Sequence, residues 1–299
     1  MEDTRITTRL IWGGMMLHLL LWLALHLPAY LGFTQHHFMG EAAIRTTALC
    51  TAYALALLLN LRIAGEYKNA PWLRLAWMAL AGNAGFSVLR ILAESQLFNL
   101  LAEGYTRSSL HGLLQHLAIV PANALLLLGL LAMWQGYHRV GLGFTIERRD
   151  YAAVVLILGL MAALLVFREG LSEARSSYLT ARYLQQSGLI LLSLCAATSV
   201  VLHRVAVQMG GGKLAVTLKF LAFYALLRAV LVLIQAWFRL AAPELNNPLG
   251  TTALYLDICW QAAPWLATLA AAYRAELTTH AARELAQYRA ARSAMVSLG

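Results

Sequence analysis

Three charged residues lie inside otherwise apolar stretches and are the strongest candidates for chemistry in this sequence: Arg90, Arg228 and Asp257. A charge at membrane depth costs at least about 2.5 kcal/mol unless it is paired or hydrated, so none of the three should face lipid. Counting about 1.5 Å per residue from the ends of the stretches puts all three in the half of the membrane away from the basic loops. The simplest arrangement is an ion pair between Arg228 and Asp257 on neighbouring helices, with Arg90 closer to the membrane surface.

These charges have a structural and a functional interpretation. In the structural one, the pair between Arg228 and Asp257 fixes the register of two helices. In the functional one, the two arginines line a polar pocket that opens outward and bind an anionic or carbonyl group of a small molecule. Asn83 and Gln261 are further candidates for this pocket, because both are polar residues within apolar stretches.

Histidine offers a second chemistry, because two histidines on facing helices can hold a b-type haem. His26 and His116 fall in the outer halves of their stretches, and Arg90 would lie near a haem propionate. A familiar haem-binding four-helix core instead carries two histidines on each of two helices, about thirteen or fourteen residues apart, and no stretch here does. Ordinary hydrogen-bonded histidines between helices are therefore favoured. No cofactor is predicted, and haem b stays the alternative.

Other catalytic and metal-binding patterns are absent from the sequence. It has no Gly-rich phosphate loop, no Gly-x-Ser-x-Gly and no His-Glu-x-x-His. The segment Met209-Gly210-Gly211-Gly212-Lys213 lacks the phosphate-loop pattern and is predicted to be a plain turn. Cys50, Cys195 and Cys259 have no metal-ligand spacing and look like small apolar core residues. No metal site is predicted.

The elements that position these residues are long apolar stretches. Hydrophobic residues make up 60% of the chain, charged residues only 12%, and the mean hydropathy is +0.64, which is typical of a membrane protein. Because lipid offers the backbone no hydrogen-bond partners, the stretches must be helices, and the fold class is an all-α polytopic bundle of about eight transmembrane helices. The predicted spans are 10–32, 44–63, 72–93, 110–135, 151–167, 183–206, 214–238 and 251–273.

Basic residues predict the orientation. Most of the Lys and Arg residues fall at the N-terminus, in the 2–3, 4–5 and 6–7 connections and after residue 273, so that both termini are expected in the cytoplasm. The expected location of the chain is a bacterial inner membrane. The net charge of +9 is spread along this rim rather than over one surface with interleaved aromatic residues. Anionic lipid headgroups are therefore the expected partner, and nucleic acid is not.

A weak internal match suggests a duplication. Phe86-Ser87-Val88-Leu89-Arg90 aligns with Tyr224-Ala225-Leu226-Leu227-Arg228, which would make residues 10–139 and 151–273 two four-helix repeats. Chance similarity between Leu- and Ala-rich helices is the favoured explanation of this match.

A polar helix is predicted to continue directly from the last span. Residues 1–273 form the predicted eight-span domain, and residues 274–299 form a cytoplasmic helix. Apolar residues recur along it in steps of four and three, the seam of a two-stranded coiled coil with one polar interruption, which predicts a homodimer. An amphipathic helix on the inner leaflet is the alternative. The seam consists of Leu277, Ala281, Glu284, Tyr288, Ala291, Met295 and Leu298.

The end of this helix carries a family resemblance. The segment 288–299, ending in Met295-Val296-Ser297-Leu298-Gly299, resembles the signalling helix that leads into the dimerisation and phosphotransfer domain of sensor histidine kinases. The resemblance implies the membrane sensor domain of a two-component system, whose kinase domain would lie beyond Gly299. His280, followed by Ala281 and Ala282, does not match the phospho-acceptor motif of that family.

Three functions are consistent with these features. The favoured one is a sensor that detects a membrane-borne or extracytoplasmic cue in the outer half of the bundle and transmits it through the C-terminal helix. A small-solute transporter is the second, supported by the charges in the spans and the duplication. A haem-linked redox protein is the third.

Overall fold

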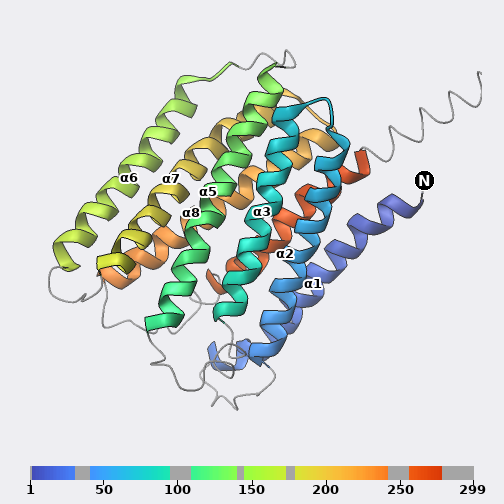
Figure 1. Ribbon diagram of the computed structural model, residues 1–299. Coiled ribbons are helices and arrows are strands. Elements are labelled where there is room, and N and C mark those ends of the chain that lie inside the picture. The colour runs from blue at the N-terminus through green and yellow to red at the C-terminus, as the bar shows by residue number, and fades with distance from the viewer. Residues whose placement is uncertain are drawn as a thin grey trace, which may run out of the picture.

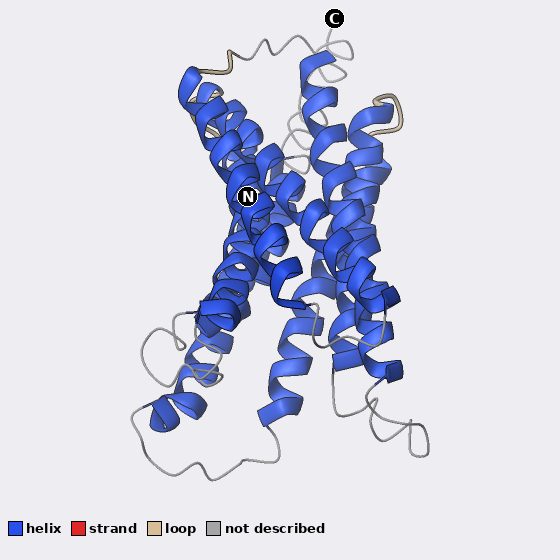
Figure 2. Cartoon of the chain, turned by 90° about the vertical axis from the view of Figure 1, so that its left-hand side faces the viewer, coloured by secondary structure: helices blue, strands red, loops and turns tan. Residues whose placement is uncertain are grey.

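The computed structural model describes residues 2–30, 41–94, 109–139, 145–172, 179–241 and 256–277. Seven helices are α1 (Glu2–Tyr30), α2 (Glu41–Glu66), α3 (Pro71–Glu94), α5 (Ser109–Arg139), α6 (Arg148–Ser172), α7 (Leu179–Gln208) and α8 (Lys213–Ala241). Residues 256–277 form one more helix, which we call the last helix. Within these ranges the chain forms no β-strand (Figure 2).

The helices confirm the all-α membrane bundle. Six of them, in the described part of the chain, are long and apolar enough to cross a membrane. Their apolar ranges are Thr7–Leu27, Ile44–Glu66, Pro71–Ala93, Leu117–Arg139, Gln186–Gln208 and Lys213–Ile234, which overlap the first four and the sixth and seventh predicted spans. The predicted seam from residue 278 onward lies outside the described residues, as does its Glu284.

The α2–α3 turn, the α7–α8 turn and the C-terminal end of the last helix lie at one end of the bundle, which we call the tail end. The α2–α3 turn lies there, because Tyr67 in this turn accepts a hydrogen bond from Arg274 of the last helix. The α7–α8 turn lies there too, because Lys213 at the start of α8 forms an ion pair with Glu276 of the last helix, Nζ to Oε2 2.9 Å. The chain continues from the last helix at this end.

The α7–α8 connection is the plain turn that the sequence predicts. Gly210 and Gly212 have φ angles of 73° and 100°, in the left-handed region that favours glycine, and Met209 N donates to the Val205 carbonyl at 3.0 Å. These glycines end α7 and start α8 within a few residues. They therefore serve the backbone turn, as expected.

Close packing between α3 and α5 depends on small residues. A Cβ atom added to Gly136 would lie 2.6 Å from Leu73 Cδ2, and one added to Gly129 would lie 2.9 Å from Leu80 Cγ. Without side chains at these positions, the two backbones approach closely, as is common between membrane helices. The contact packs α3 closely against α5 along the length from Gly129 to Gly136.

The last helix lies inside the bundle, whereas α6 lies at its edge. Every residue from 256 to 277 is buried or half-buried, while most described side chains of α6 are exposed, including Val155 and Leu156. Figure 1 shows α6 and α1 at opposite sides of the bundle and the last helix passing between α1 and α8. The helix from which the chain runs on into the predicted tail is thus the one that most of the bundle surrounds.

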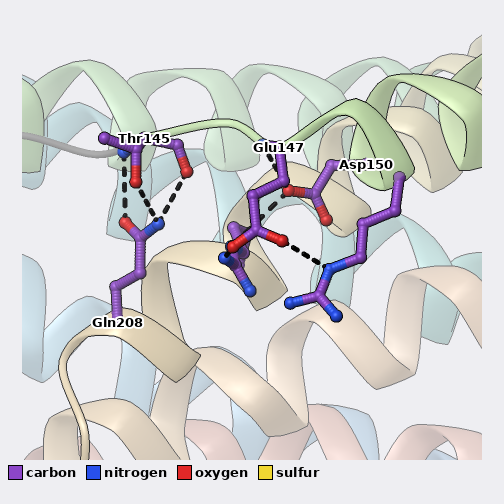
Figure 3. Close-up of polar contacts among 6 residues, drawn as sticks. Thr145, Glu147, Asp150 and Gln208 are labelled. Atoms are coloured by element: carbon purple, nitrogen blue, oxygen red, sulfur yellow. Dashed lines mark hydrogen bonds and ion pairs between the residues drawn. The ribbon is translucent and has the colours of Figure 1, made fainter.

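The start of α6 is fixed to the tail end by polar contacts (Figure 3). Gln208, the last residue of α7, donates from Nε2 to the carbonyl of Thr145 at 2.6 Å and to its hydroxyl at 3.0 Å. Arg204 pairs with Glu147 and, at 3.5 Å, with Asp150 Oδ2. The backbone N–H of Glu147 donates to Asp150 Oδ2 at 2.9 Å and caps the helix. These carboxylates are therefore occupied at the surface of the bundle.

Candidate functional site

A buried guanidinium is the centre of the candidate site. Arg228 lies about four turns into α8 from the tail end and is only 4% exposed. Its Nη1 donates to the hydroxyl of Tyr224, one turn earlier, at 3.0 Å, and its Nη2 donates to Asn123 Oδ1 of α5 at 3.0 Å. The guanidinium carbon lies 5.5 Å from the centre of the Tyr224 ring, a cation–π distance. The group is thus solvated by neutral oxygens and an aromatic face.

Two asparagines hold the acceptors of this arginine in place. Asn123 Nδ2 donates to the carbonyl of Gly188 in α7 at 3.2 Å, which orients its Oδ1 toward Arg228. Asn83 of α3 donates to the carbonyl of Ala122 at 2.7 Å and accepts from the Tyr224 hydroxyl at 3.2 Å. The Arg228 network therefore spans α3, α5, α7 and α8 at one depth.

The network extends to α2. The hydroxyl of Tyr53 lies 3.4 Å from that of Tyr224 and is buried. The preceding residue, Ala52, accepts a hydrogen bond through its carbonyl from Thr268 Oγ1 of the last helix at 2.7 Å. We call the set Tyr53, Asn83, Asn123, Tyr224 and Arg228 the polar layer. Through α2 it is joined to the last helix.

The hydrogen bonds of Arg228 go to neutral partners rather than to the predicted Asp257. The hydrogen bonds of Arg228 go to the Tyr224 hydroxyl and to Asn123 Oδ1, and Arg228 takes part in none of the ion pairs described above. The prediction assumed that helices adjacent in sequence turn their polar residues toward each other. Here α8 instead presents Arg228 to α5, so the charge is satisfied by uncharged acceptors.

The other predicted site residues have separate positions. Asn83 belongs to the polar layer, whereas Gln261 is buried in the last helix and its Oε1 has no hydrogen-bond partner among the described residues. Arg90 and Asp257 are half-buried on α3 and the last helix. Of these four candidates, Asn83 is the one that the described hydrogen bonds join to Arg228 through Tyr224.

Of the two histidines in the haem hypothesis, the structure describes the side chain of His26. His26 Nδ1 lies 2.8 Å from the Trp22 carbonyl and therefore carries a proton, and its ring stacks on Trp22 with centroids 4.4 Å apart. The side chain of His116 lies outside the described residues, so a haem between the two stays a prediction. Where side chains are described, no group of three or more His, Cys, Asp or Glu residues could hold a metal ion.

A small cavity adjoins the polar layer. It has room for about one water molecule, with a volume of about 10 Å³, and Tyr224 and Asn83 are among the residues that line it. Asn60 Oδ1 and Trp77 Nε1 are buried there with no partner among the described side chains. A donor and an acceptor that face one cavity can bind a single small polar molecule between them.

The last helix is bound along its length by other helices. Near its middle, Trp265 Nε1 donates to His18 Nδ1 of α1 at 3.0 Å, which places the proton of this neutral histidine on Nε2. At the tail end, the Tyr273 ring stacks on Phe220 of α8, with centroids 5.5 Å apart and planes 14° apart. The Trp12 indole donates to the Tyr273 hydroxyl at 3.4 Å.

Two charged residues complete the contacts at the exit of the last helix. Arg274 donates through Nε to the Tyr67 hydroxyl at 2.9 Å, with its guanidinium 5.1 Å from the centre of that ring. Glu276 is 5% exposed, accepts from the Thr8 hydroxyl and pairs with Lys213. We call Tyr273, Arg274 and Glu276 with their partners the exit clamp. It ties the last helix to α1, α8 and the α2–α3 turn.

Sequence reasoning missed Asn123, Tyr53 and the exit clamp. A usable signal existed for Asn123, because the separation between Asn123 and Gln261 equals that between Arg90 and Arg228. An alignment of the two predicted repeats would therefore match Asn123 with Gln261 as well as Arg90 with Arg228. Neutral residues such as Tyr53 give no such signal, since they cost little in an apolar stretch.

Comparison with protein-family models, with curated proteins and with solved structures finds no match.

Proposed function

We propose that this chain is the input domain of a membrane signal transducer of the two-component type. The observation that carries the proposal is the position of the last helix, which is surrounded by the bundle and clamped where the chain leaves it. Its contacts reach α1 through Trp265, α2 through Thr268 and α8 through Glu276. A rearrangement of any of these helices changes contacts of the helix that leads into the predicted coiled coil.

In this proposal the polar layer is the sensing element. Arg228 is a buried cation whose hydrogen bonds go to neutral acceptors, so an anionic or carbonyl ligand would gain more from approaching it than from an already paired arginine. Displacing Tyr224 from Arg228 would also disturb its contact with Tyr53, next to the residue that binds Thr268. The route from site to exit thus consists of packed and hydrogen-bonded groups.

The proposal includes eight crossings of a bacterial inner membrane, with both termini in the cytoplasm. Single cysteines at Asn69, in the α2–α3 turn, and at Thr34 should be labelled from opposite sides, with Asn69 accessible from the cytoplasm. The three native cysteines, which are free, are first replaced by alanine. Labelling of both positions from one side would contradict the orientation.

The tail is proposed to form a parallel homodimer. Cysteines at Ala281, Tyr288 or Met295 should then cross-link between chains far better than cysteines at Arg283 or Arg289, because parallel pairing places each seam residue opposite itself. Equal cross-linking at seam and outer positions would favour the inner-leaflet helix instead.

Signalling itself is tested by fusion in helical register to the phosphotransfer and catalytic domains of a histidine kinase. Insertions of one to seven alanines directly after Leu277 leave the exit clamp intact. They should change autophosphorylation in proteoliposomes with a period of about seven residues. The matched control inserts the same alanines before the kinase in a soluble chain that lacks residues 1–277. Output indifferent to insertion length in the full fusion would reject the proposal.

A transporter is the second candidate, favoured by the buried cation of Arg228. Proteoliposomes loaded with radiolabelled chloride, phosphate or acetate would test it, with Arg228→Leu as the variant and Arg62→Ala, an exposed residue of α2, as the control. Flux that requires Arg228 would favour transport over sensing. For the haem alternative, a Soret band in the purified protein's absorption spectrum is the test.

A further inference from the structure

A groove between α7 and α8 lies apart from the polar layer. It has a volume of about 490 Å³, and its walls are almost entirely apolar. Two basic residues, His203 of α7 and Lys219 of α8, stand on it, and both are exposed. The apolar residues include Val200, Phe220 and Phe223, the last of which is 53% exposed. An apolar trough with basic residues is suited to an amphipathic anion.

The depth of the two basic residues matches that of lipid phosphates. His203 lies about one and a half turns before the end of α7 at Gln208, and Lys219 about one and a half turns after the start of α8 at Lys213. Both are therefore about 8 Å along the helices from the tail end, where a lysine can extend its amine to the headgroup region. The apolar walls continue from there toward the membrane centre.

Local carboxylates are already paired elsewhere. Glu147 and Asp150 bind Arg204, and Glu276 binds Lys213. No described carboxylate forms an ion pair with Lys219 or His203. The groove therefore presents uncompensated positive charge beside apolar surface.

We propose that this groove binds an anionic phospholipid, with one acyl chain along the α7–α8 trough and the phosphate at Lys219 and His203. Basic pockets between transmembrane helices are typical sites for acidic headgroups. A zwitterionic lipid would fill the trough equally well but would gain less from the two basic residues.

The floor of the groove adjoins the exit clamp. Phe220 lines the groove, stacks on Tyr273 and packs edge-on against Trp12, with centroids 6.0 Å apart in the second contact. A bound acyl chain would press on Phe220 and hence on the last helix. This consequence rests on the proposed function, whereas lipid binding does not.

Native mass spectrometry of the purified chain tests the binding, with phosphatidylglycerol and phosphatidylcholine of identical acyl chains present in equal amounts. Phosphatidylglycerol should bind preferentially, and Lys219→Ala should weaken its binding about five-fold, the effect of one basic residue at a membrane surface. Arg62→Ala, at similar depth on α2 and exposed, is the matched control and should leave binding unchanged. Equal binding of the two lipids, or equal loss in the control, would overturn the proposal.

A second variant tests the trough. Val200 is half-buried on the groove wall, and Val200→Trp should fill the trough and exclude the acyl chain. Neither lipid should then bind. Leu58→Trp, at a residue that is 63% exposed on α2, adds the same bulk away from the groove and should bind normally. Unchanged binding in Val200→Trp would reject the site. Interchain disulfides from a cysteine at Phe223 would show that a second copy covers the groove, and would also reject it.

The lipid site and the signalling function can be refuted independently of each other. If lipid binds as expected but the kinase fusion responds equally in phosphatidylglycerol and phosphatidylcholine vesicles, the site stands and its coupling to the last helix is refuted. If lipid does not bind but output still varies with the insertions after Leu277, the lipid site is refuted and the signalling function stands.

Discussion

The hydrogen bond between Arg228 and Asn123 predicts that a second substitution recovers part of the stability lost to a first. Asn123→Leu removes an acceptor from a buried charge and leaves a side chain of similar size in its place. A hydrogen bond between a neutral acceptor and a charged group is worth about 1.5–3 kcal/mol. Asn123→Leu should therefore destabilise the bundle by about 1.5–3 kcal/mol.

The second substitution should recover part of this loss. Arg228→Leu in the Asn123→Leu background removes the buried charge itself, whose cost at membrane depth is at least about 2.5 kcal/mol. The double variant should thus be more stable than Asn123→Leu alone. The bond from Asn123 to the Gly188 carbonyl is lost in both backgrounds and cancels in the comparison.

The assay is a double-mutant cycle on the free energy of unfolding, measured by titration with a denaturing detergent in mixed micelles. A coupling of about 2 kcal/mol or more is expected between Asn123 and Arg228. The matched control cycle combines Asn123→Leu with Arg90→Leu, the same substitution of an arginine on α3, and should be additive within about 0.5 kcal/mol. Additivity in the first cycle would mean that the guanidinium does not depend on this acceptor.

Two further predictions concern the packing of the helices. Trp265→Phe should destabilise the bundle by about 1–3 kcal/mol, because it leaves the buried Nδ1 of His18 without its donor, whereas Trp260→Phe should cost less, since its Nε1 has no partner in the described structure. Gly136→Ala should destabilise by about 1–3 kcal/mol through its clash with α3, while Gly85→Ala, which has open space around it, should stabilise by about 0.4–1 kcal/mol. The same detergent titration measures both pairs, and equal effects within either pair would contradict the contacts described.

Hydropathy was sufficient to predict the helices but not how they rotate about their axes. The first four predicted spans, the sixth and seventh spans and the Met209–Lys213 turn followed from apolar length and glycine content, and these predictions are confirmed. The partner of Arg228 was not predictable in this way. Its helix is apolar on most sides, so the burial pattern does not fix which neighbour the guanidinium meets, and Asn123 carries no charge that would identify it as the partner.

The central place of the last helix was also hidden, although the sequence held a clue. It carries several small residues, among them Ala267, Ala270 and Ala271, which allow neighbouring helices to approach closely. In a hydropathy profile, the same residues give only a weakly apolar stretch. Burial by protein and burial by lipid demand similar side chains, so the profile alone does not tell the two apart.

In the proposed signalling function the last helix needs two arrangements that a ligand can tell apart, and the exit clamp would set the energy between them. The ion pair of Glu276 with Lys213, whose side chain is 38% exposed, is worth about 0.2–1 kcal/mol. The bond from Thr8 to the same carboxylate is worth about 1.5–3 kcal/mol, as a hydrogen bond to a charged group.

Moving a two-state equilibrium from 1:99 to 99:1 takes about 5.5 kcal/mol of differential binding. The two contacts of Glu276 together are worth about 2–4 kcal/mol, which is below this figure. A ligand in the polar layer or a lipid in the α7–α8 groove would therefore need only an ordinary difference in affinity to release the last helix. Glu276→Gln, which weakens the clamp without removing its side chain, should shift the output of the kinase fusion in one direction with no ligand added. Unchanged basal output in this variant would show that the clamp holds the fold together without setting the signal.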